Sequence, residues 1–419
     1  MMRSQSGDEA PPARVLFFEY SELNPRLRED PLSLYDPQRA ERPAERDAFI
    51  PAVLITSYAL AREMLLDPNL SRNFNDSAPD NIVIANVRKL NAAVEGEFGP
   101  HASILTLDDP DHARVRGVVA EAFLKRAAAA QPLIAEVIEA QLQRLEGRER
   151  FDVINDYASR IPIRVLGALL GCDEDKLEDL KRWTEAGQGA FDPTNSEETE
   201  RLAIEARRGI LGHFKHLMEE RRKAPRDDLV SDLLAARDNG APIADHEILH
   251  NLFALLVAGH LTTADMIGNG IMMLLKHPEA REALERNPKL WPTAIEEILR
   301  YNPPISNTAR FPKEGGKIGG CPYHGGDALT VALMAANFDP EKFEDPHKFD
   351  VTRRPNPHLA FGAGAHICIG APLARIEGQM AIMRLFERFP KLRRAEEGPL
   401  DWRPIPGIRG LAKLDVLAS

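Results

Sequence analysis

The amino-acid sequence predicts a mainly α-helical protein with small peripheral β-sheets. The first observation is one long helical segment, residues 245–276, whose central part is apolar on every face. The second is the region 119–183, which alternates amphipathic helical segments with short breaks. Strand character is confined to short segments such as residues 15–18 and 52–56. We therefore expect helices to form the core and sheets to lie at its edge.

Composition and charge are those of a globular protein. The chain has 419 residues, of which 43% are hydrophobic and 28% charged, so a sizeable core can form. Its formal net charge of −11 disfavours binding to nucleic acid or to anionic membranes, because both need clustered positive charge. The cysteines Cys172, Cys321 and Cys368 are odd in number and far apart, which is typical of a reducing compartment. We therefore expect a cytoplasmic protein.

The chain is expected to form a single domain over residues 14–419, preceded by a flexible tail over residues 1–13. The tail is polar and lacks the apolar segment of a signal peptide or a membrane anchor. Residues 15–18 are apolar but far too few to cross a bilayer. The protein is therefore expected to carry no membrane anchor.

The first half of the chain is predicted to contain a helix over residues 57–66, capped by Ser57, where apolar residues recur at spacings of three and four. Residues 71–104 mix Asn, Asp, Gly and Pro without a sustained period, which predicts a long irregular connection. Another helix is expected to begin at Asp109.

The helices of the region 119–183 are expected to break at Gly147, Pro162 and Gly171. Residues 184–200 carry glycines, a proline and a run of Ser, Glu and Thr, which predicts a polar linker. A further helix is expected over residues 202–223.

The long helix 245–276 is predicted to be buried in the protein. Its N-cap is expected to be Asp245. Its uninterrupted apolar run is well below the roughly 20 residues that a membrane span needs. Gly259 is followed by Thr262 and Thr263, whose hydroxyls can bond to the carbonyl one turn earlier and distort the helix. From the residues alone, these hydroxyls are explained equally well as buried groups satisfied by the helix.

Residues 361–370 form the most informative stretch, Phe361-Gly362-Ala363-Gly364-Ala365-His366-Ile367-Cys368-Ile369-Gly370. Glycines at 362, 364 and 370 permit positive φ angles, so that successive amides can point at the Cys368 sulfur. A helix expected over residues 371–389 would add positive potential at its start, which lowers a thiol pKa and favours a metal-binding thiolate. One thiolate without further Cys or His at zinc-finger spacing suits haem iron better than structural zinc. The alternative is a glycine-rich loop around an inert cysteine.

This stretch matches in full the cysteine-ligand signature of the cytochrome P450 family, the haem-thiolate monooxygenases, and resembles the soluble bacterial type. The resemblance implies a cytochrome P450 fold with haem b buried between the long helix and the cysteine loop. It also implies cofactor-binding roles: Cys368 as axial ligand of the haem iron, Phe361 beside the sulfur, Gly370 closing the loop, and His112, Arg116, Arg310 and His366 at the haem propionates. Without the resemblance to this family, His112 and Arg116 would be interpreted as solvent-exposed residues at the start of a helix.

The resemblance also gives the long helix a catalytic role. The segment from Gly259 to Thr263 matches the oxygen-binding groove, and Thr262 matches the hydroxyl that hydrogen-bonds dioxygen. Leu261 stands where the family usually has the acid that relays protons. Asp265, substrate or water could complete the relay, and we expect substrate or water to do so. Residues 71–104 are expected to cover the substrate pocket, whose predicted lining is Leu255, Ala258, Leu261, Ile305 and Ile408, with Arg409 in the same turn as Ile408.

Glu297 and Arg300 match the Glu-x-x-Arg core pair of the family, which would otherwise be an ordinary surface pair. The family often adds an arginine from a later segment, where this chain has Lys348, so the sequence does not identify a third partner. Cys321 and His324 could be imagined as metal ligands, but two donors make a poor site and a strand-turn-strand is expected instead.

The predicted function is a haem-thiolate monooxygenase that inserts one atom of O2 into an apolar organic small molecule. Electrons would come from a separate ferredoxin and ferredoxin reductase, and the protein would act as a monomer. One alternative is a peroxygenase driven by hydrogen peroxide, against which Thr262 argues mildly. Another is a haem sensor without turnover, although no basic module of the kind that binds DNA is present.

Overall fold

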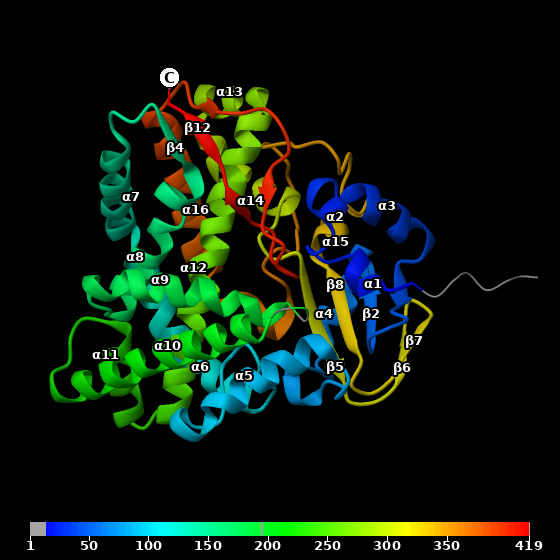
Figure 1. Cartoon of the computed structure of the whole chain (residues 1–419), viewed down its shortest axis with the longest axis vertical. Coiled ribbons are helices and arrows are strands. Elements are labelled where there is room, and N and C mark those ends of the chain that lie inside the picture. The colour runs from blue at the N-terminus through cyan, green and yellow to red at the C-terminus, as the bar shows by residue number, and fades with distance from the viewer. Residues whose placement is uncertain (1–13, 193, 195, 419) are drawn as a thin grey trace, which may run out of the picture.

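The computed structural model describes residues 14–192, 194 and 196–418. The predicted tail over residues 1–13 lies outside them. Figure 1 shows helices α7–α12 and α16 gathered on one side of the molecule, and a five-stranded sheet with α1–α4 and α15 on the other. The predicted class, mainly helical with small sheets at the edge, is confirmed.

The helices run in chain order as α1 (Leu16–Glu19), α2 (Pro25–Glu29), α3 (Leu32–Glu41), α4 (Tyr58–Leu66), α5 (Ile82–Phe98), α6 (Asp111–Ala129), α7 (Gln131–Leu145), α8 (Arg160–Leu170), α9 (Leu177–Ala186), α10 (Glu197–Lys223), α11 (Leu229–Asp238), α12 (Asp245–Lys276), α13 (Pro278–Arg286), α14 (Trp291–Tyr301), α15 (Leu333–Asn337) and α16 (Ala371–Arg388). The predicted bounds of α4, α12 and α16 hold to within about a residue.

The strands form four small sheets. The largest has the order β1 (Ala44–Arg46), β2 (Ala52–Ile55), β8 (Ala328–Ala332), β5 (Asn307–Pro312) and β3 (Leu70–Ser71), with β2 and β8 parallel. The others join β4 (Arg150–Asp152), β12 (Asp415–Leu417) and β9 (Arg393–Arg394); β10 (Asp401–Trp402) and β11 (Leu411–Lys413); and β6 (Gly316–Ile318) and β7 (Cys321–Tyr323). The β6–β7 hairpin confirms the strand-turn-strand predicted around Cys321.

Helix α12 is the central helix of the molecule and packs against α8, α10, α14 and α16 (Figure 1). It is long and apolar enough to cross a membrane, but 72% of its most apolar 18-residue window is buried inside the protein. Its N-cap is Ala244 rather than the predicted Asp245. The Ala244 amide donates to the Glu247 carboxylate at 2.8 Å, while Asp245 pairs with Arg222 at 2.6 Å. A carboxylate three residues into the helix has replaced the usual N-cap side chain.

The predicted irregular connection over residues 71–104 is wrong over Ile82–Phe98, which form the 17-residue helix α5. The apolar residues Ile84, Val87, Leu90, Val94 and Phe98 recur at spacings of three and four, a helical period that the sequence analysis overlooked. The ends carried clearer signals. Asn81 caps the helix by accepting from the Ile84 amide at 3.2 Å, and Gly99 ends it with φ +79°.

Three smaller expectations also fail. Residues 15–18 belong to the short helix α1 instead of a strand. Pro162 lies in the first turn of α8, where its missing amide costs nothing, and so causes no break. Ser57 occupies the N-cap position of α4 but makes no capping bond; the Tyr58 amide donates instead to Asp339 Oδ2 at 2.7 Å. Breaks at Gly147 and Gly171 are present, with φ angles of +77° and +84°.

A fully buried ion pair anchors the segment that precedes the cysteine loop. Glu297 and Arg300 are both 0% exposed and are joined by two hydrogen bonds of 2.8 Å. Arg300 also donates to the carbonyl of Pro346 at 2.9 Å, and the Asp350 amide donates to Glu297 at 2.9 Å. The pair therefore holds the chain over residues 346–350 against α14.

The third partner of this pair is Arg353. Its Nε lies 3.2 Å from Glu297 Oε2, so the arginine that the sequence did not place is five residues after Lys348. The Lys348 ammonium pairs with Asp350 at 3.6 Å on the surface, with 67% of its side chain exposed. Only its backbone carbonyl faces Arg300, at 3.3 Å.

Truncating this network should destabilise the protein in a graded order. Glu297→Ala strands the Arg300 guanidinium and should lower the free energy of unfolding by about 3–5 kcal/mol. Arg353→Ala removes charge-assisted bonds to a carboxylate that keeps other donors, and should cost about 1–3 kcal/mol. Lys348→Ala should stay within about 0.5 kcal/mol of the parent. Urea unfolding of the three variants measures the order, and equal losses for Lys348→Ala and Arg353→Ala would refute it.

Candidate active site

The loop before α16 is shaped by two glycines in the left-handed region. Gly362 has φ +69° and Gly364 has φ +73°. A Cβ on Gly364 would lie 2.7 Å from the Leu65 carbonyl oxygen, so α4 packs against the loop at a distance that only glycine permits. The expectation for Gly370 is wrong. Its φ is −77°, and it occupies the N-cap position of α16.

Cys368 lies between this loop and the first turn of α16. Its amide donates to the Phe361 carbonyl at 3.0 Å, which places the backbone of Phe361 beside the cysteine. The amides of Gly370 and Ala371 and the charges of Arg116 and Arg375 favour the thiolate, as the sequence predicts, while desolvation by the surrounding loop raises the thiol pKa. The Cys368 side chain itself is exposed.

Two histidines and an arginine predicted to act together do converge beside the loop. The rings of His112, on α6, and His366 stack with centroids 4.0 Å apart. His112 is 2% exposed, and its Nε2 is buried without a hydrogen-bond partner. Arg116, one turn further along α6, donates to the Ile367 carbonyl at 2.6 Å. Burial holds the pKa of both imidazoles below the usual value, to about 3 for His366, so both rings are neutral.

Arg310 joins this cluster from β5, together with Arg72, which the sequence analysis missed. Arg310 is 4% exposed and donates only to its neighbour Ala309, at 3.0 Å, and Arg72 donates to the same carbonyl at 2.8 Å. Burial lowers the pKa of Arg310 to about 9 and that of Arg72 to about 10. Within the described part of the chain, neither guanidinium hydrogen-bonds a carboxylate. Arg72 follows the short strand β3 and carries no motif that could have revealed it.

The Thr262 hydroxyl hydrogen-bonds to a carbonyl of its own helix, as predicted. Its Oγ1 donates to the Ala258 carbonyl at 2.6 Å, yet the helix remains α-helical throughout, so the expected distortion is absent. A Cβ on Gly259 would lie 2.9 Å from Leu166 on α8, which makes close helix packing the reason for this glycine. Thr263 is 6% exposed and buried among neighbouring helices.

Between Glu247 and Leu274 every residue of α12 is buried except Phe253, Val257, Ala258, Gly259 and Thr262. At 3.6 residues per turn, Phe253 and Val257 lie on one face of the helix, and Ala258 and Thr262 lie on the opposite face. Ala258 and Thr262 therefore form the accessible strip that carries the hydroxyl. Of the predicted pocket residues, Ala258 lies in this strip, whereas Leu255 and Leu261 are 7% and 5% exposed. Ile305 and Ile408 are half-buried and form a β-bridge with each other.

Two charged residues near these elements point elsewhere. Asp265 is 2% exposed and pairs with Arg403, which ties α12 to the C-terminal hairpin; burial raises its pKa to about 6. Arg409 was expected to enter the pocket with Ile408, but it is 6% exposed and donates to Asn302 at 2.7 Å. Its guanidinium lies 4.0 Å from the Trp402 ring. Because both side chains make these contacts, neither extends its charge to the accessible strip of α12.

Comparison with known proteins agrees with this arrangement. A family model of cytochrome P450 matches residues 86–401. Cytochrome P450 107B1 of Saccharopolyspora erythraea is 37% identical over 93% of each chain, and the monooxygenase PikC of Streptomyces venezuelae is 34% identical over 99% of this chain and 97% of its own. A myxobacterial P450 solved with myristic acid superimposes with a TM-score of 0.87 at 33% identity, covering 96% of this chain and 99% of its own.

The chain belongs to the cytochrome P450 family. Its relatives are soluble bacterial enzymes, and its cofactor, like theirs, is haem b. The predicted class is thereby confirmed: the protein is a haem monooxygenase that transfers one oxygen atom from O2 to an apolar organic small molecule. Bacterial members of this class take their electrons from ferredoxin-type partners.

The residues present fit haem b. The group brings two carboxylates, and the described structure holds two guanidinium groups, the buried Arg310 and the half-buried Arg72, that hydrogen-bond no carboxylate. The buried Nε2 of His112 also lacks a hydrogen-bond partner. Cations withdrawn from water without a partner cost free energy, so their clustering near His366 is explained by an anionic group that neutralises them.

Removing either guanidinium should weaken haem retention without harming the fold. Arg310→Gln and Arg72→Gln each delete a charge-assisted bond to a propionate, and haem transfer to apomyoglobin should quicken by about 10-fold. Because no carboxylate is stranded, the melting temperature of the haem-free protein should not fall. Lys313→Gln, beside β5 with 64% of its side chain exposed, is the control. A fall in haem-free stability equal to that of the loaded protein would make these arginines structural.

Proposed function

We propose the following roles in the monooxygenase reaction. Cys368 would bind the haem iron as a thiolate, and His112, Arg116, Arg310, His366 and the newly identified Arg72 would hold the propionates. The haem, when bound, supplies the oxidising power for O–O cleavage and oxygen transfer. The protein supplies the ligand, an apolar pocket and a route for protons. The observation that carries this proposal is the convergence of these arginines and histidines, from α6, β5, the residue after β3 and the cysteine loop itself.

Thr262 is the proton-delivering hydroxyl in this proposal. It lies in the accessible strip of α12, and its hydrogen bond to the Ala258 carbonyl fixes the direction of its lone pairs. Leu261 cannot carry a proton, and Asp265 is committed to Arg403. Water or a polar group of the substrate must therefore bring protons to Thr262.

Replacing the hydroxyl should uncouple the enzyme. Thr262→Ala should divert most reducing equivalents to hydrogen peroxide, because the protons needed for O–O cleavage no longer arrive in order. Asp265→Asn should change the product formed per NADH only slightly. Both ratios are measured with a turned-over substrate and a bacterial ferredoxin system. Full coupling in Thr262→Ala would favour the peroxide-driven alternative, and uncoupling in Asp265→Asn would assign the relay to that carboxylate.

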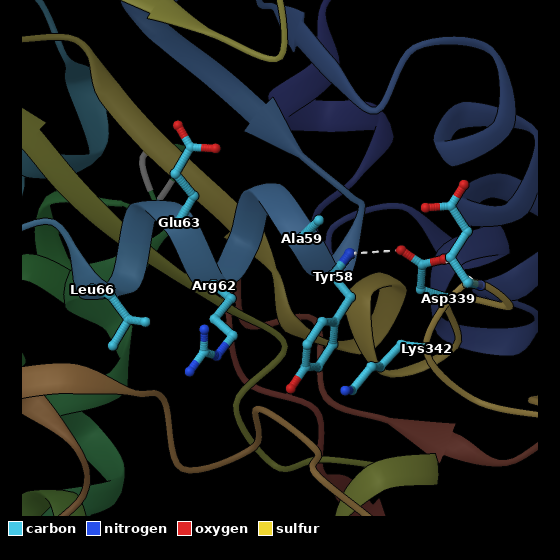
Figure 2. Close-up of a pocket in the computed structure, with 8 residues that line it drawn as sticks. Tyr58, Ala59, Arg62, Glu63, Leu66, Asp339 and Lys342 are labelled. Atoms are coloured by element: carbon cyan, nitrogen blue, oxygen red, sulfur yellow. Dashed lines mark hydrogen bonds between the residues drawn. The ribbon is translucent and has the colours of Figure 1, made fainter.

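The electron donor is proposed to be a ferredoxin-type protein that docks near the outer side of the cysteine loop. Ile367, in this loop, and Leu66, on α4 beside it, are 48% and 43% exposed. A surface groove of about 400 Å³ runs along α4. Figure 2 shows Arg62 and Leu66 extending toward one side of α4 and Glu63 toward the other. Arg62 and Lys342 bring positive charge to a groove that also holds carboxylates, and these two cations are proposed to meet an acidic donor.

Reversing the charge at this surface should slow electron delivery. Arg62 is exposed, and no ion pair joins it to any residue that the structure describes. Arg62→Glu should lower the rate of reduction by ferredoxin about 5–10-fold at low salt, with the difference shrinking as salt screens the charges. Reduction by dithionite should be unchanged. Arg182→Glu, on α9 with 70% of its side chain exposed, is the matched control. Equal slowing in both variants would exclude a docking role for α4.

We further propose that the chain acts as a cytoplasmic monomer with one catalytic domain over residues 14–419. Helix α12 contacts α8, α10, α14 and α16 as well as strand β11, which supports one cooperative unit. The odd number of widely separated cysteines, typical of a reducing compartment, supports the location.

A further inference from the structure

A network of three polar side chains lies beside the ring of Phe361, the first residue of the cysteine loop. Arg375, in the second turn of α16, places its guanidinium over this ring, with Cζ 4.6 Å from the ring centroid. The His358 ring, in the segment before the loop, has its centroid 6.1 Å from that of Phe361. Glu296, on α14, bonds to both Arg375 and His358. Three elements therefore meet where the loop begins.

The hydrogen bonds of this network fix the orientation of the guanidinium. Arg375 donates from Nε to Glu296 Oε1 at 2.7 Å and from Nη2 to Oε2 at 2.9 Å, which is the bidentate geometry of strong arginine–carboxylate pairs. His358 donates from Nε2 to the same carboxylate at 3.2 Å, while its Nδ1 accepts from the Ala360 amide at 3.2 Å. Desolvation raises the pKa of Glu296, but the bonds from His358 and Arg375 outweigh it and hold this pKa at about 2. The carboxylate is therefore charged and keeps Arg375 over the Phe361 ring.

The same guanidinium acts on Cys368. The Phe361 carbonyl accepts from the Cys368 amide at 3.0 Å, so the residue under the guanidinium also holds the backbone of the cysteine. Desolvation raises the pKa of the Cys368 thiol, and the charge of Arg375 is among the influences that lower it. The Arg375 side chain is 41% exposed, so water screens part of this charge. Its effect at the sulfur is therefore moderate in size.

We propose that Arg375 is a positioning residue for the metal ligand: its guanidinium holds the Phe361 ring at the loop and, through its charge, raises the reduction potential of the haem bound at Cys368. The inference rests on the proposed role of Cys368 as the axial ligand. A nearby cation favours the reduced form, because reduction adds one negative charge. A cation beside the sulfur also limits the electron density that the thiolate donates to the iron. Glu296 and His358 orient this cation.

The test measures the ferric–ferrous midpoint potential of the haem-loaded protein by titration with dithionite and mediator dyes, without a redox partner or substrate. Arg375→Gln should shift the equilibrium about 3–10-fold toward ferric iron, which lowers the potential by about 30–60 mV for a one-electron couple. Arg375→Lys keeps the charge and loses the planar pair, so its potential should lie between those of the parent and Arg375→Gln.

Arg384→Gln is the matched control. Arg384 lies nine residues further along α16 with 54% of its side chain exposed, so this change removes an equal charge away from the loop. Its potential should equal that of the parent. The absorption band of the ferrous carbon monoxide complex that marks thiolate ligation should persist in every variant, and haem content checks that each one folds.

Several outcomes would overturn the proposal. An unchanged or raised potential in Arg375→Gln would make the pair with Glu296 purely structural, whatever the stability of the variant. An equal shift in Arg384→Gln would show an effect of net charge alone, and an equal loss in Arg375→Lys would exclude an effect of the local charge. Loss of the thiolate band from Arg375→Gln would show that ligation itself needs the arginine. Absence of this band from the parent would instead overturn the proposed ligation by Cys368 and, with it, this inference.

Discussion

Arg300 is fully buried, and the position of the cysteine loop depends on how its charge is neutralised. Glu297 meets it in a two-bond pair, and the carboxylate also accepts from Arg353, Asn356 and the Asp350 amide. A buried ion pair is costly unless every remaining donor and acceptor is satisfied. Here that satisfaction comes from the backbone of residues 337–350. Because the buried Arg300 guanidinium needs acceptors for its hydrogen bonds, it fixes the path of the chain that leads to Cys368.

The molecule treats two other cations differently. Arg310 is buried and Arg72 is half-buried, and neither hydrogen-bonds a carboxylate of any residue that the structure describes; both donate to the Ala309 carbonyl instead. The buried Arg221, in contrast, pairs with Asp228 at 2.5 Å. Both unpaired guanidinium groups lie near His366, where they favour an anion. On α12, Thr262 supplies a hydroxyl suited to proton transfer.

Much of this arrangement is predictable from local chemistry. The cysteine loop, the bounds of α12 and the pairing of Glu297 with Arg300 all follow from short spacings in the sequence. Helix α5 was also predictable, since Ile84, Val87, Leu90, Val94 and Phe98 keep a helical period and Asn81 and Gly99 mark its ends. Arg353 and Arg72 could not be found in this way, because what makes each one significant is a partner, or the lack of one, far along the chain. The positive φ expected at Gly370 failed because this residue occupies the N-cap position of α16 with a negative φ.

The contact of α4 with the cysteine loop has a consequence for synthesis of the protein. Tyr58 bonds to Asp339, 281 positions later, Leu65 meets Gly364, and β2 lies parallel to β8. The N-terminal strands therefore find their partners only after most of the chain has left the ribosome. Until then β2 has an unpaired edge and α4 an uncovered face, which are features that attract chaperones or promote aggregation. Truncation before residue 328 should thus expose the N-terminal third, because it removes β8, Asp339 and Gly364 together with Cys368.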